Sequence, residues 1–384
     1  MNSVDILKDL IAFPTVSADP NRALIDYCAG LLQDAGARIE IIEDETGRKA
    51  NLYGTLGPQD VPGVLLSGHT DVVPVEGQDW TVPPFQATQS DGKIYGRGTA
   101  DMKGFVACTL ALARRAANTD LQTPLHFAFS YDEEIGCIGV RSLIDMLAAA
   151  PFVPRLCIVG EPTFMKVATG HKGKTACQIN CRGREGHSAL APDALNAIHL
   201  ATDMVMFIRQ LQDKIAASAA RDADYDVPYT TCHVGLINGG VALNIVPNLA
   251  TLRFEIRNLI DDDPEQLMGE IKDHAAQLLE PLKDRFPEAD IGFEITNTYP
   301  PLDTAPDADV VSFVKSLTGS NDTIKVAFGT EGGLFSSHLG IQTVICGPGS
   351  MAQGHKPDEF VEIAQLAKCD DMLDALLARL AEGI

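Results

Sequence analysis

The sequence is poor in positive charge and contains no long hydrophobic run. It has 30 Lys and Arg residues against 52 Asp and Glu residues, which gives a formal net charge of −22. Nucleic acids and anionic membranes bind basic patches, so this balance argues against both as partners. No stretch reaches the roughly 18 apolar residues that a membrane span requires, and the first ten residues lack the basic segment of a secretory signal. We therefore expect no nucleic-acid partner and no membrane association.

The cysteines fit neither a disulfide framework nor a structural zinc motif. Nine are present, an odd number, and no two have the CxxC spacing. This pattern is typical of reduced thiols inside a cytoplasmic protein, and we expect that location. With 384 residues, of which 45% are apolar, the chain is long enough for two globular domains.

Short apolar runs alternate with amphipathic segments in the first part of the chain. The pattern indicates strands that are buried on both faces and separated by helices. We predict strands at 38–42, 51–56, 64–67, 125–131 and 156–159, and helices at 20–36, 102–117 and 138–150. The alternation returns after residue 287 and ends in a helix near 360–381. The predicted fold class is α/β, with a mostly parallel central sheet and helices on both faces.

The middle of the chain has a different pattern. Segments 175–181, 230–236 and 250–257 alternate polar and apolar residues, as half-exposed antiparallel strands do. Two long amphipathic helices are expected at about 193–219 and 264–279. We predict a catalytic domain made of residues 1–172 and 285–384, interrupted by a smaller α+β domain at 173–284.

Side chains that can bind metal follow several of the predicted strands. Ligands collect at the carboxyl ends of strands in open α/β sheets, so these positions suit a binding site. The residues are His69, Asp71, Asp101, Glu133, Glu134, Glu161 and His355. Imidazole and carboxylate ligands suit Zn, Co or Mn. Taken singly, Asp101 could cap the helix that follows it, and the acidic run 132–134 could be a solvated turn. The prediction therefore rests on the whole set.

As a set, the motifs GHTD, GRGTADMKG, DEE, GEPT and GHKPDEF resemble a metallopeptidase family. It includes acetylornithine deacetylase, succinyl-diaminopimelate desuccinylase, aminoacylase-1 and dinuclear carboxypeptidases. The resemblance covers essentially the whole chain and implies two divalent ions, Zn or Co. One ion would be bound by His69, Asp101 and Glu161. Asp101 would bridge to the second ion, which Glu134 and His355 would also bind.

The same resemblance assigns further roles. It implies that Asp71 supports His69 and that Glu133 is the general base. The smaller domain is expected to act as a lid and to form a homodimer, in which His187 reaches the neighbouring subunit's site. Asn244 and Arg257 are expected to contact the substrate carboxylate. Taken alone, His187 could be a surface loop residue and Arg257 could form a surface ion pair.

The activity implied by the resemblance is metal-dependent hydrolysis of an N-acyl amino acid, a small molecule. The stretch FGTEGGLF at 328–335 resembles the loop of the family's acetylornithine deacetylases. We therefore expect cleavage of N2-acetyl-L-ornithine to L-ornithine and acetate, with Glu331 attracting the ornithine ammonium. Two alternatives remain open: a deacylase for another N-acyl amino acid, such as an aminoacylase or desuccinylase, and a metal-binding relative without catalysis.

Overall fold

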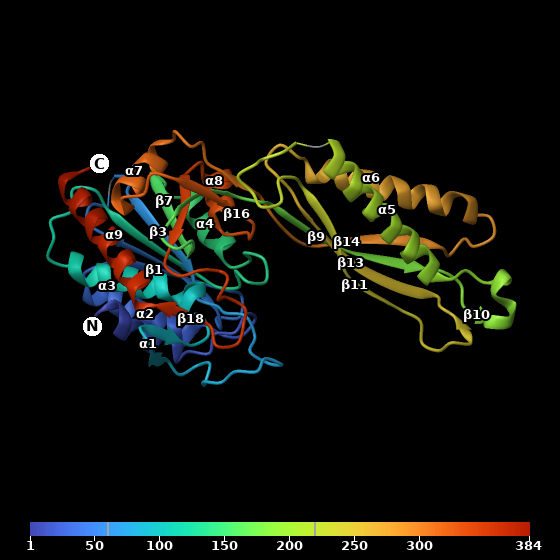
Figure 1. Ribbon diagram of the computed structural model, residues 1–384, viewed down its shortest axis with the longest axis horizontal. Helices are drawn as coiled ribbons and strands as arrows, with labels where there is room; N and C mark the ends of the chain where they lie inside the picture. Colours follow the sequence, from blue (N-terminus) through green and yellow to red (C-terminus); the bar gives the residue numbers. More distant parts are fainter. Residues whose placement is uncertain (60, 219) are drawn as a thin grey trace. The chain divides into compact units, whose positions relative to one another are not determined.

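The computed structural model describes residues 1–59, 61–218 and 220–384, which form two compact units (Figure 1). Unit 1 consists of Met1–Gly170, Leu302–Val326 and Thr330–Ile384, and unit 2 of His171–Pro301 and Ala327–Gly329. Unit 2 therefore extends beyond the predicted insertion at 173–284. The difference arises because β14 (Asp290–Tyr299) pairs with β9 (Lys174–Arg182) and so belongs to the sheet of unit 2.

The main sheet of unit 1 has a parallel centre, as predicted. Its order is β1-β2-β6-β3-β7-β17-β8-β15, and β16 pairs with β8. The pairs β6–β3, β3–β7 and β7–β17 are parallel, whereas β1–β2, β2–β6 and β17–β8 are antiparallel. The strands are β1 (Arg38–Glu43), β2 (Ala50–Leu56), β3 (Val64–His69), β6 (Leu125–Ser130), β7 (Leu156–Pro162), β8 (Val167–His171), β15 (Leu302–Asp303), β16 (Thr323–Val326) and β17 (Gln342–Gly347).

Helices cover both faces of this sheet. Along β2, a side chain at Gly54 would meet Leu32 of α2, whereas Asn51 donates a hydrogen bond to Ser142 of α4. Since strand residues of opposite parity point to opposite faces, α2 and α4 lie on different sides. The helices are α1 (Ser3–Ile11), α2 (Arg22–Asp34), α3 (Gly104–Ala116), α4 (Val140–Ala148), α7 (Asp309–Thr318), α8 (Gly332–Leu339) and α9 (Ile363–Glu382). Among the described residues, no helix is long and apolar enough to cross a membrane.

A small antiparallel sheet in unit 1 changes one predicted boundary. Its order is β18-β5-β4, with β4 (Thr88–Ser90), β5 (Lys93–Tyr95) and β18 (Phe360–Glu362). The last helix was predicted to start near residue 360. It starts at Ile363, because the backbone of 360–362 pairs with β5 instead. This pairing fixes the chain that follows the GHKPDEF motif.

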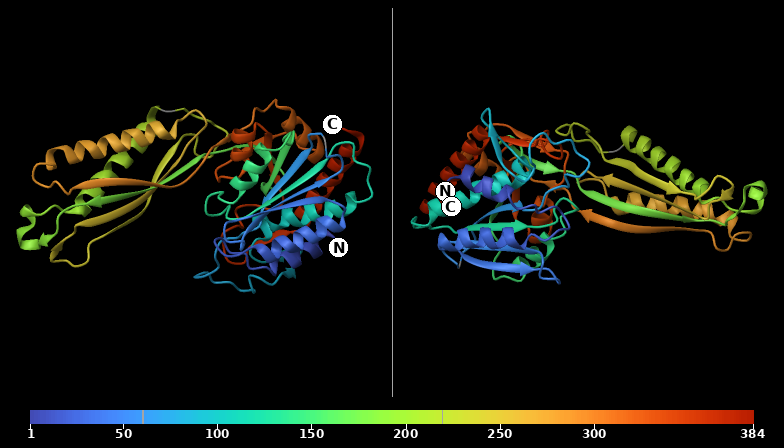
Figure 2. Two further views of the ribbon diagram at one scale, coloured as in Figure 1. Left: turned by 180° about the vertical axis from the view of Figure 1, so that it is seen from behind. Right: turned by 90° about the horizontal axis from the view of Figure 1, so that it is seen from below.

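Unit 2 is an antiparallel sheet with two helices on one face (Figure 2). The strand order is β11-β13-β9-β14, so β11 and β14 are the edges. The elements are β9, β10 (Gly186–His187), α5 (Ala197–Ser218), β11 (Thr231–Gly239), β12 (Ile245–Val246), β13 (Leu249–Arg257), α6 (Pro264–Leu279) and β14. In β9 and β13 the predicted alternation reflects buried residues facing the helices and more exposed residues facing away, whereas the edge strand β11 is exposed along most of its length. Residue 219, the predicted end of the first helix, lies outside the described residues.

Candidate metal centre

The carboxyl ends of three adjacent strands carry the candidate site. β6, β3 and β7 run parallel to one another, so their ends meet at one edge of the sheet. His69 is the last residue of β3, and Glu161 is the second-to-last residue of β7. Glu133 and Glu134 follow β6 in the loop that leads to α4. The motifs GHTD, DEE and GEPT converge here because each one lies at the end of a buried strand.

Asp101 lies between two imidazoles. It belongs to a short helical turn, Thr99–Lys103, that leads into α3. Its Oδ1 is 3.0 Å from Nε2 of His69, and its Oδ2 is 3.1 Å from Nε2 of His355. His355 comes from the loop between β17 and β18 and has a φ of 60°. Asp101 therefore presents one carboxylate oxygen to each imidazole, which is the arrangement that a bridging ligand needs.

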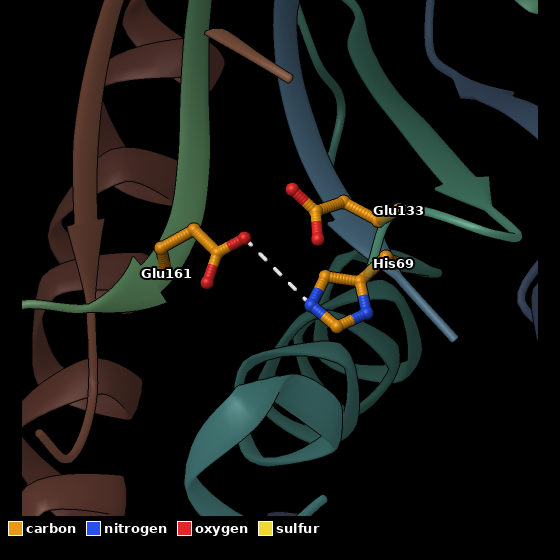
Figure 3. Close-up of side chains that lie close together, drawn as sticks. All are labelled: His69, Glu133 and Glu161. Carbon is orange, nitrogen blue, oxygen red and sulfur yellow. Dashed lines mark ion pairs between the residues drawn. The ribbon is translucent and has the colours of Figure 1, made fainter. Parts of the chain in front are cut away.

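Each imidazole also faces a further carboxylate. Nε2 of His69 is 3.7 Å from Oε1 of Glu161 (Figure 3). Nε2 of His355 is 3.0 Å from Oε2 of Glu134. Two sets of side chains have ligand atoms that all lie within 4.8 Å of one another, namely His69 with Glu133 and Glu161, and His69 with Asp101 and Glu134. Unit 1 thus brings all five predicted metal ligands together.

The chemistry of this donor set fits divalent metal ions. His69, Asp101 and Glu161 are each no more than 2% exposed. Oδ2 of Asp101 is buried, and Nε2 of His355 lies 3.1 Å from it without meeting hydrogen-bond geometry, although a buried carboxylate oxygen normally has a well-formed hydrogen bond. Zinc and similar ions bind imidazole nitrogen and carboxylate oxygen. Such an ion would give this oxygen a partner and would offset the repulsion among the buried carboxylates.

Burial and mutual repulsion raise the pKa values of the site's glutamates and so favour their protonated forms. Burial raises the pKa of both Glu133 and Glu161 well above the ordinary value, and neighbouring carboxylates raise it further. Burial also raises the pKa of Glu134 to about 7. The contacts with Asp101 and Glu134 raise the pKa of His355 to about 10. Because metal ions bind neutral imidazole and ionised carboxylate, metal uptake must displace protons.

Asp71 contacts both His69 and the acidic loop. Its backbone oxygen accepts the Nδ1–H of His69 at 2.9 Å, which leaves Nε2 directed at Asp101. Its carboxylate accepts the backbone N–H groups of Glu133 at 3.1 Å and Glu134 at 3.3 Å. It also accepts the hydroxyl of Ser17 at 2.6 Å. Asp71 therefore links His69 to the acidic pair. Ser17 was not among the predicted site residues, because no motif includes it.

Glu133 lies beside His69 and Glu161. Figure 3 shows its carboxylate on the opposite side of the shared space from that of Glu161. Its Oε1 accepts the thiol of Cys137 at 3.3 Å. Burial raises the pKa of the Glu133 carboxyl well above its ordinary value, and a raised pKa makes a carboxylate a stronger acceptor for the proton that it must later return. Cys137 was interpreted as a core thiol, since nothing in its local sequence distinguishes a buried packing cysteine from one that contacts the site.

The position of Glu331 differs from the expected contact with an ornithine ammonium. It is 1% exposed, and its carboxylate accepts the hydroxyls of Ser67 and Ser130. Burial raises its pKa to about 7. The difference arises because Glu331 immediately precedes α8 and its carboxylate is held against β3 and β6. The TE pair in the sequence gave no indication that two strand hydroxyls would occupy this carboxylate.

His187 and Asn244 lie close together at one end of unit 2. β10 and β12 pair His187 with Ile245, and the N–H of Ser188 bonds to the carbonyl of Asn244. Both side chains are exposed. A cavity of about 530 Å³ lies beside them, lined largely by the apolar residues of 239–247. These two predicted residues therefore share one surface of unit 2.

Arg257 lies at the far end of β13, in the four-stranded sheet. β13 starts at Leu249, near the loop that carries Asn244, and ends at Arg257. The eight steps between these two residues span about 26 Å at 3.3 Å per residue. The Arg257 guanidinium binds both carboxylate oxygens of Glu255, at 3.0 and 3.1 Å, and the hydroxyl of Tyr299 at 2.7 Å. Asn244 and Arg257 of one chain are thus too far apart to hold the same substrate carboxylate.

Residues 65–379 match the model of peptidase family M20/M25/M40. The chain is also 34% identical over 366 residues to an acetylornithine deacetylase of Klebsiella pneumoniae and to one of Shigella sonnei. In both cases the match covers 94% of this chain and 92% of the relative. The chain belongs to the M20/M25/M40 peptidase family. It is therefore an amidohydrolase of this family, and the clustered imidazoles and carboxylates are its candidate metal site.

Solved structures support the fold. An M20 family metallo-carboxypeptidase of Sulfolobus solfataricus aligns with a TM-score of 0.81 at 18% identity and covers 100% of both chains. A dipeptidase of Saccharomyces cerevisiae aligns with a TM-score of 0.78 at 16% identity, covering 99% of this chain and 96% of the other. The predicted α/β architecture and the predicted family are both confirmed.

The raised pKa values predict that metal uptake is coupled to proton release. At pH 7 the metal-free His355 imidazole carries a proton, since its pKa is about 10. Metal uptake should release this proton. The metal Kd should therefore fall about tenfold for each unit by which the pH rises, for each proton released. Calorimetric titration with Zn²⁺ in buffers of different ionisation enthalpy measures the release.

A matched pair of histidine variants tests the assignment. His355→Ala should lower both the number of ions bound and the number of protons released. His338→Ala removes an exposed imidazole of α8 that hydrogen-bonds to the neighbouring Ser337, and it should behave as wild type. Uptake by the wild type without proton release at pH 7 would show that His355 carries no proton before the metal binds.

Proposed function

We propose that the protein hydrolyses N2-acetyl-L-ornithine to L-ornithine and acetate, a reaction of arginine biosynthesis, with two divalent ions, Zn or Co. Amide hydrolysis rests on one observation above all: Asp101 presents one carboxylate oxygen to His69 and the other to His355. Acetylornithine as the substrate is supported by the two deacetylases that are 34% identical over nearly the whole chain.

The proposed ligands divide into two sets that share Asp101. His69 and Glu161 complete one set, and Glu134 and His355 complete the other. When bound, two divalent ions lower the pKa of a water molecule and polarise the amide carbonyl. Asp71 fixes the tautomer of His69 through the Nδ1–H contact, so that Nε2 is the nitrogen available to an ion.

Glu133 is the proposed general base and general acid. Its carboxylate takes a proton from the attacking water and later gives it to the α-amine that leaves as the C–N bond breaks. Burial raises its pKa, which favours holding the proton between these two steps. The hydrogen bond from its backbone N–H to Asp71 holds the backbone that carries this side chain. The products are acetate and ornithine, and one water is consumed.

Two charged features support the proposed substrate recognition: the Arg257 guanidinium and the net charge of the chain. Arg257 is the proposed partner of the substrate carboxylate, because its guanidinium already binds a carboxylate through two nitrogens. Substrate would then replace Glu255. The net charge of −22 favours a substrate whose side chain carries an ammonium group. We assign Glu331 no direct contact with the substrate, because it is buried and both its carboxylate oxygens accept hydroxyls from strand residues.

The proposed assembly is a homodimer formed through unit 2. At the end that carries His187, Val241 is 89% exposed and Leu243 is fully exposed. On the adjoining edge strand β11, Leu236 and Ile237 are each more than half exposed. Exposed apolar residues beside an edge strand favour pairing with a second copy. Such a pairing would also bring His187 to a neighbouring chain, which explains its distance from Arg257.

We also propose a cytoplasmic location. All nine cysteines are free and buried, and burial raises the pKa of thiols such as Cys157 and Cys346, which keeps them unreactive. Buried, unpaired thiols are typical of proteins in a reducing compartment.

Replacement of the proposed base separates chemistry from metal binding. Glu133→Gln should retain the ions and lose two or more orders of magnitude in kcat, because the amide can neither take nor return a proton. Steady-state kinetics and metal analysis measure the two effects. Glu76→Gln, on an exposed loop, is the matched control and should keep wild-type rates. A Glu133→Gln protein that loses an ion and recovers its rate in excess metal would instead identify Glu133 as a ligand.

A panel of substrates tests the proposed specificity. The values of kcat/KM are compared for N2-acetyl-ornithine, N-acetyl-methionine, N-formyl amino acids and N-succinyl-diaminopimelate. We expect N2-acetyl-ornithine to exceed each rival at least tenfold, which equals about 1.4 kcal/mol of transition-state binding. A rival preferred by that margin would replace the substrate and leave the amidohydrolase chemistry intact. No turnover of any member by the metal-loaded protein would favour a metal-binding relative without catalysis.

Mixed dimers test the proposed contribution of His187 to a neighbouring chain. His187→Ala and Glu133→Gln proteins, each inactive alone, should regain activity after subunit exchange. Each hybrid contains one site with an intact Glu133 and a partner that supplies His187. A mixture of His187→Ala with the Glu133→Gln, His187→Ala double variant should stay inactive. Absence of recovery after verified exchange would show that His187 does not act in the neighbouring subunit.

A further inference from the structure

Glu359 is a buried carboxylate whose contacts all lead to one loop. It is 1% exposed and belongs to the chain that precedes β18. Its Oε1 accepts the backbone N–H groups of Ala100 at 2.9 Å and Asp101 at 3.1 Å. Its Oε2 accepts the N–H of Gly98 at 3.0 Å and a hydrogen bond from Arg97 at 2.7 Å. Glu359 therefore holds the backbone on which the proposed bridging ligand is mounted.

Arg97 extends this contact to the loop of the second imidazole. It is also 1% exposed, and its Nη1 donates to the backbone oxygen of Lys356 at 3.3 Å. Its Nη2 donates to Oε1 of Gln78 at 2.5 Å. The Nε2 of Gln78 in turn donates to the backbone oxygen of His355 at 3.1 Å. The carbonyls of both His355 and Lys356 are thus held, one of them through Gln78.

The loop that receives these contacts needs external support. His355 has a φ of 60°, in the left-handed region that non-glycine residues adopt only when surrounding contacts hold them there. Its side chain is also partly exposed, at 48%, so packing alone does not fix it. The Gln78 and Arg97 contacts are made to the backbone at and after this residue.

We propose that Glu359, Arg97 and Gln78 are positioning residues that set the spacing between Asp101 and His355, so that the two can bind one metal ion together. The inference rests on the proposed metal centre. One network connects the two backbones: Glu359 holds the Asp101 side and Arg97, and Arg97 with Gln78 holds the His355 side. Groups that orient metal ligands in this way typically change metal affinity ten- to a hundredfold when removed.

Gln78→Ala is the principal test, because Gln78 is only half-buried and its loss should leave the fold intact. Zn²⁺ is titrated into metal-free protein by calorimetry, and the visible spectrum of the Co²⁺ form reports the coordination. We expect the Kd of one of two ions to rise tenfold or more, with a changed Co²⁺ spectrum. Glu359→Gln should have the same effect, because it replaces one accepting oxygen with a donor.

Gln59→Ala is the matched control, since the exposed Gln59 amide also donates to a backbone carbonyl, that of Gly57, but it precedes the start of β3, whereas the site lies at the carboxyl end of that strand. It should bind both ions as wild type does. If Gln78→Ala binds two ions with wild-type Kd values and only its metal-free Tm falls, the network is structural and the positioning role is refuted. If the wild type binds no ion, the metal centre itself is refuted, and the positioning role falls with it.

Discussion

Mutual repulsion of carboxylates in a buried space is the constraint on which this structure depends. Asp101, Glu133, Glu134 and Glu161 lie around two imidazoles, and three of the site's side chains are at most 2% exposed. Carboxylates in such a place are stable only with protons or cations beside them. The raised pKa values of the glutamates and of His355 show that protons reduce this repulsion when no cation is bound. Divalent ions would reduce the repulsion as well, and the imidazole and carboxylate donors of the site suit such ions.

Much of unit 1 and its site could be predicted because sheet geometry makes local patterns informative. A run of buried residues such as Val64–Leu66 identifies a strand, and the polar residue after it lies at the carboxyl end of that strand. In a parallel sheet the carboxyl ends of neighbouring strands lie at the same edge, so these polar residues lie close together. His69, Glu161 and the acidic pair were found in this way. Asp101 and His355 lie on turns, and their recognition depended on the resemblance of whole motifs.

Other features could not be predicted because they depend on contacts between distant segments. β14 was missed, and with it the end of unit 2, since its membership follows from pairing with β9. The sequence around Glu331 suggested a free anion, whereas two serines on separate strands bind it. The sequence left an ion pair open for Arg257, but it did not identify Glu255 and Tyr299 as the partners of the guanidinium. In each case the interacting residue or strand is distant in the sequence or lies on the same strand face, and no sequence motif identifies it.

The proposed ligands are spread from position 69 to position 355, and this spread links metal supply to folding. An unfolded chain cannot bring residues so far apart in sequence around one ion, so the ions bind the native state almost exclusively. Mass action then adds about 2.7 kcal/mol of native stability when the free ion exceeds its Kd a hundredfold. A metal-starved cell would therefore lose native protein as well as catalytic centres, because more of the chain would populate states that proteases can cut.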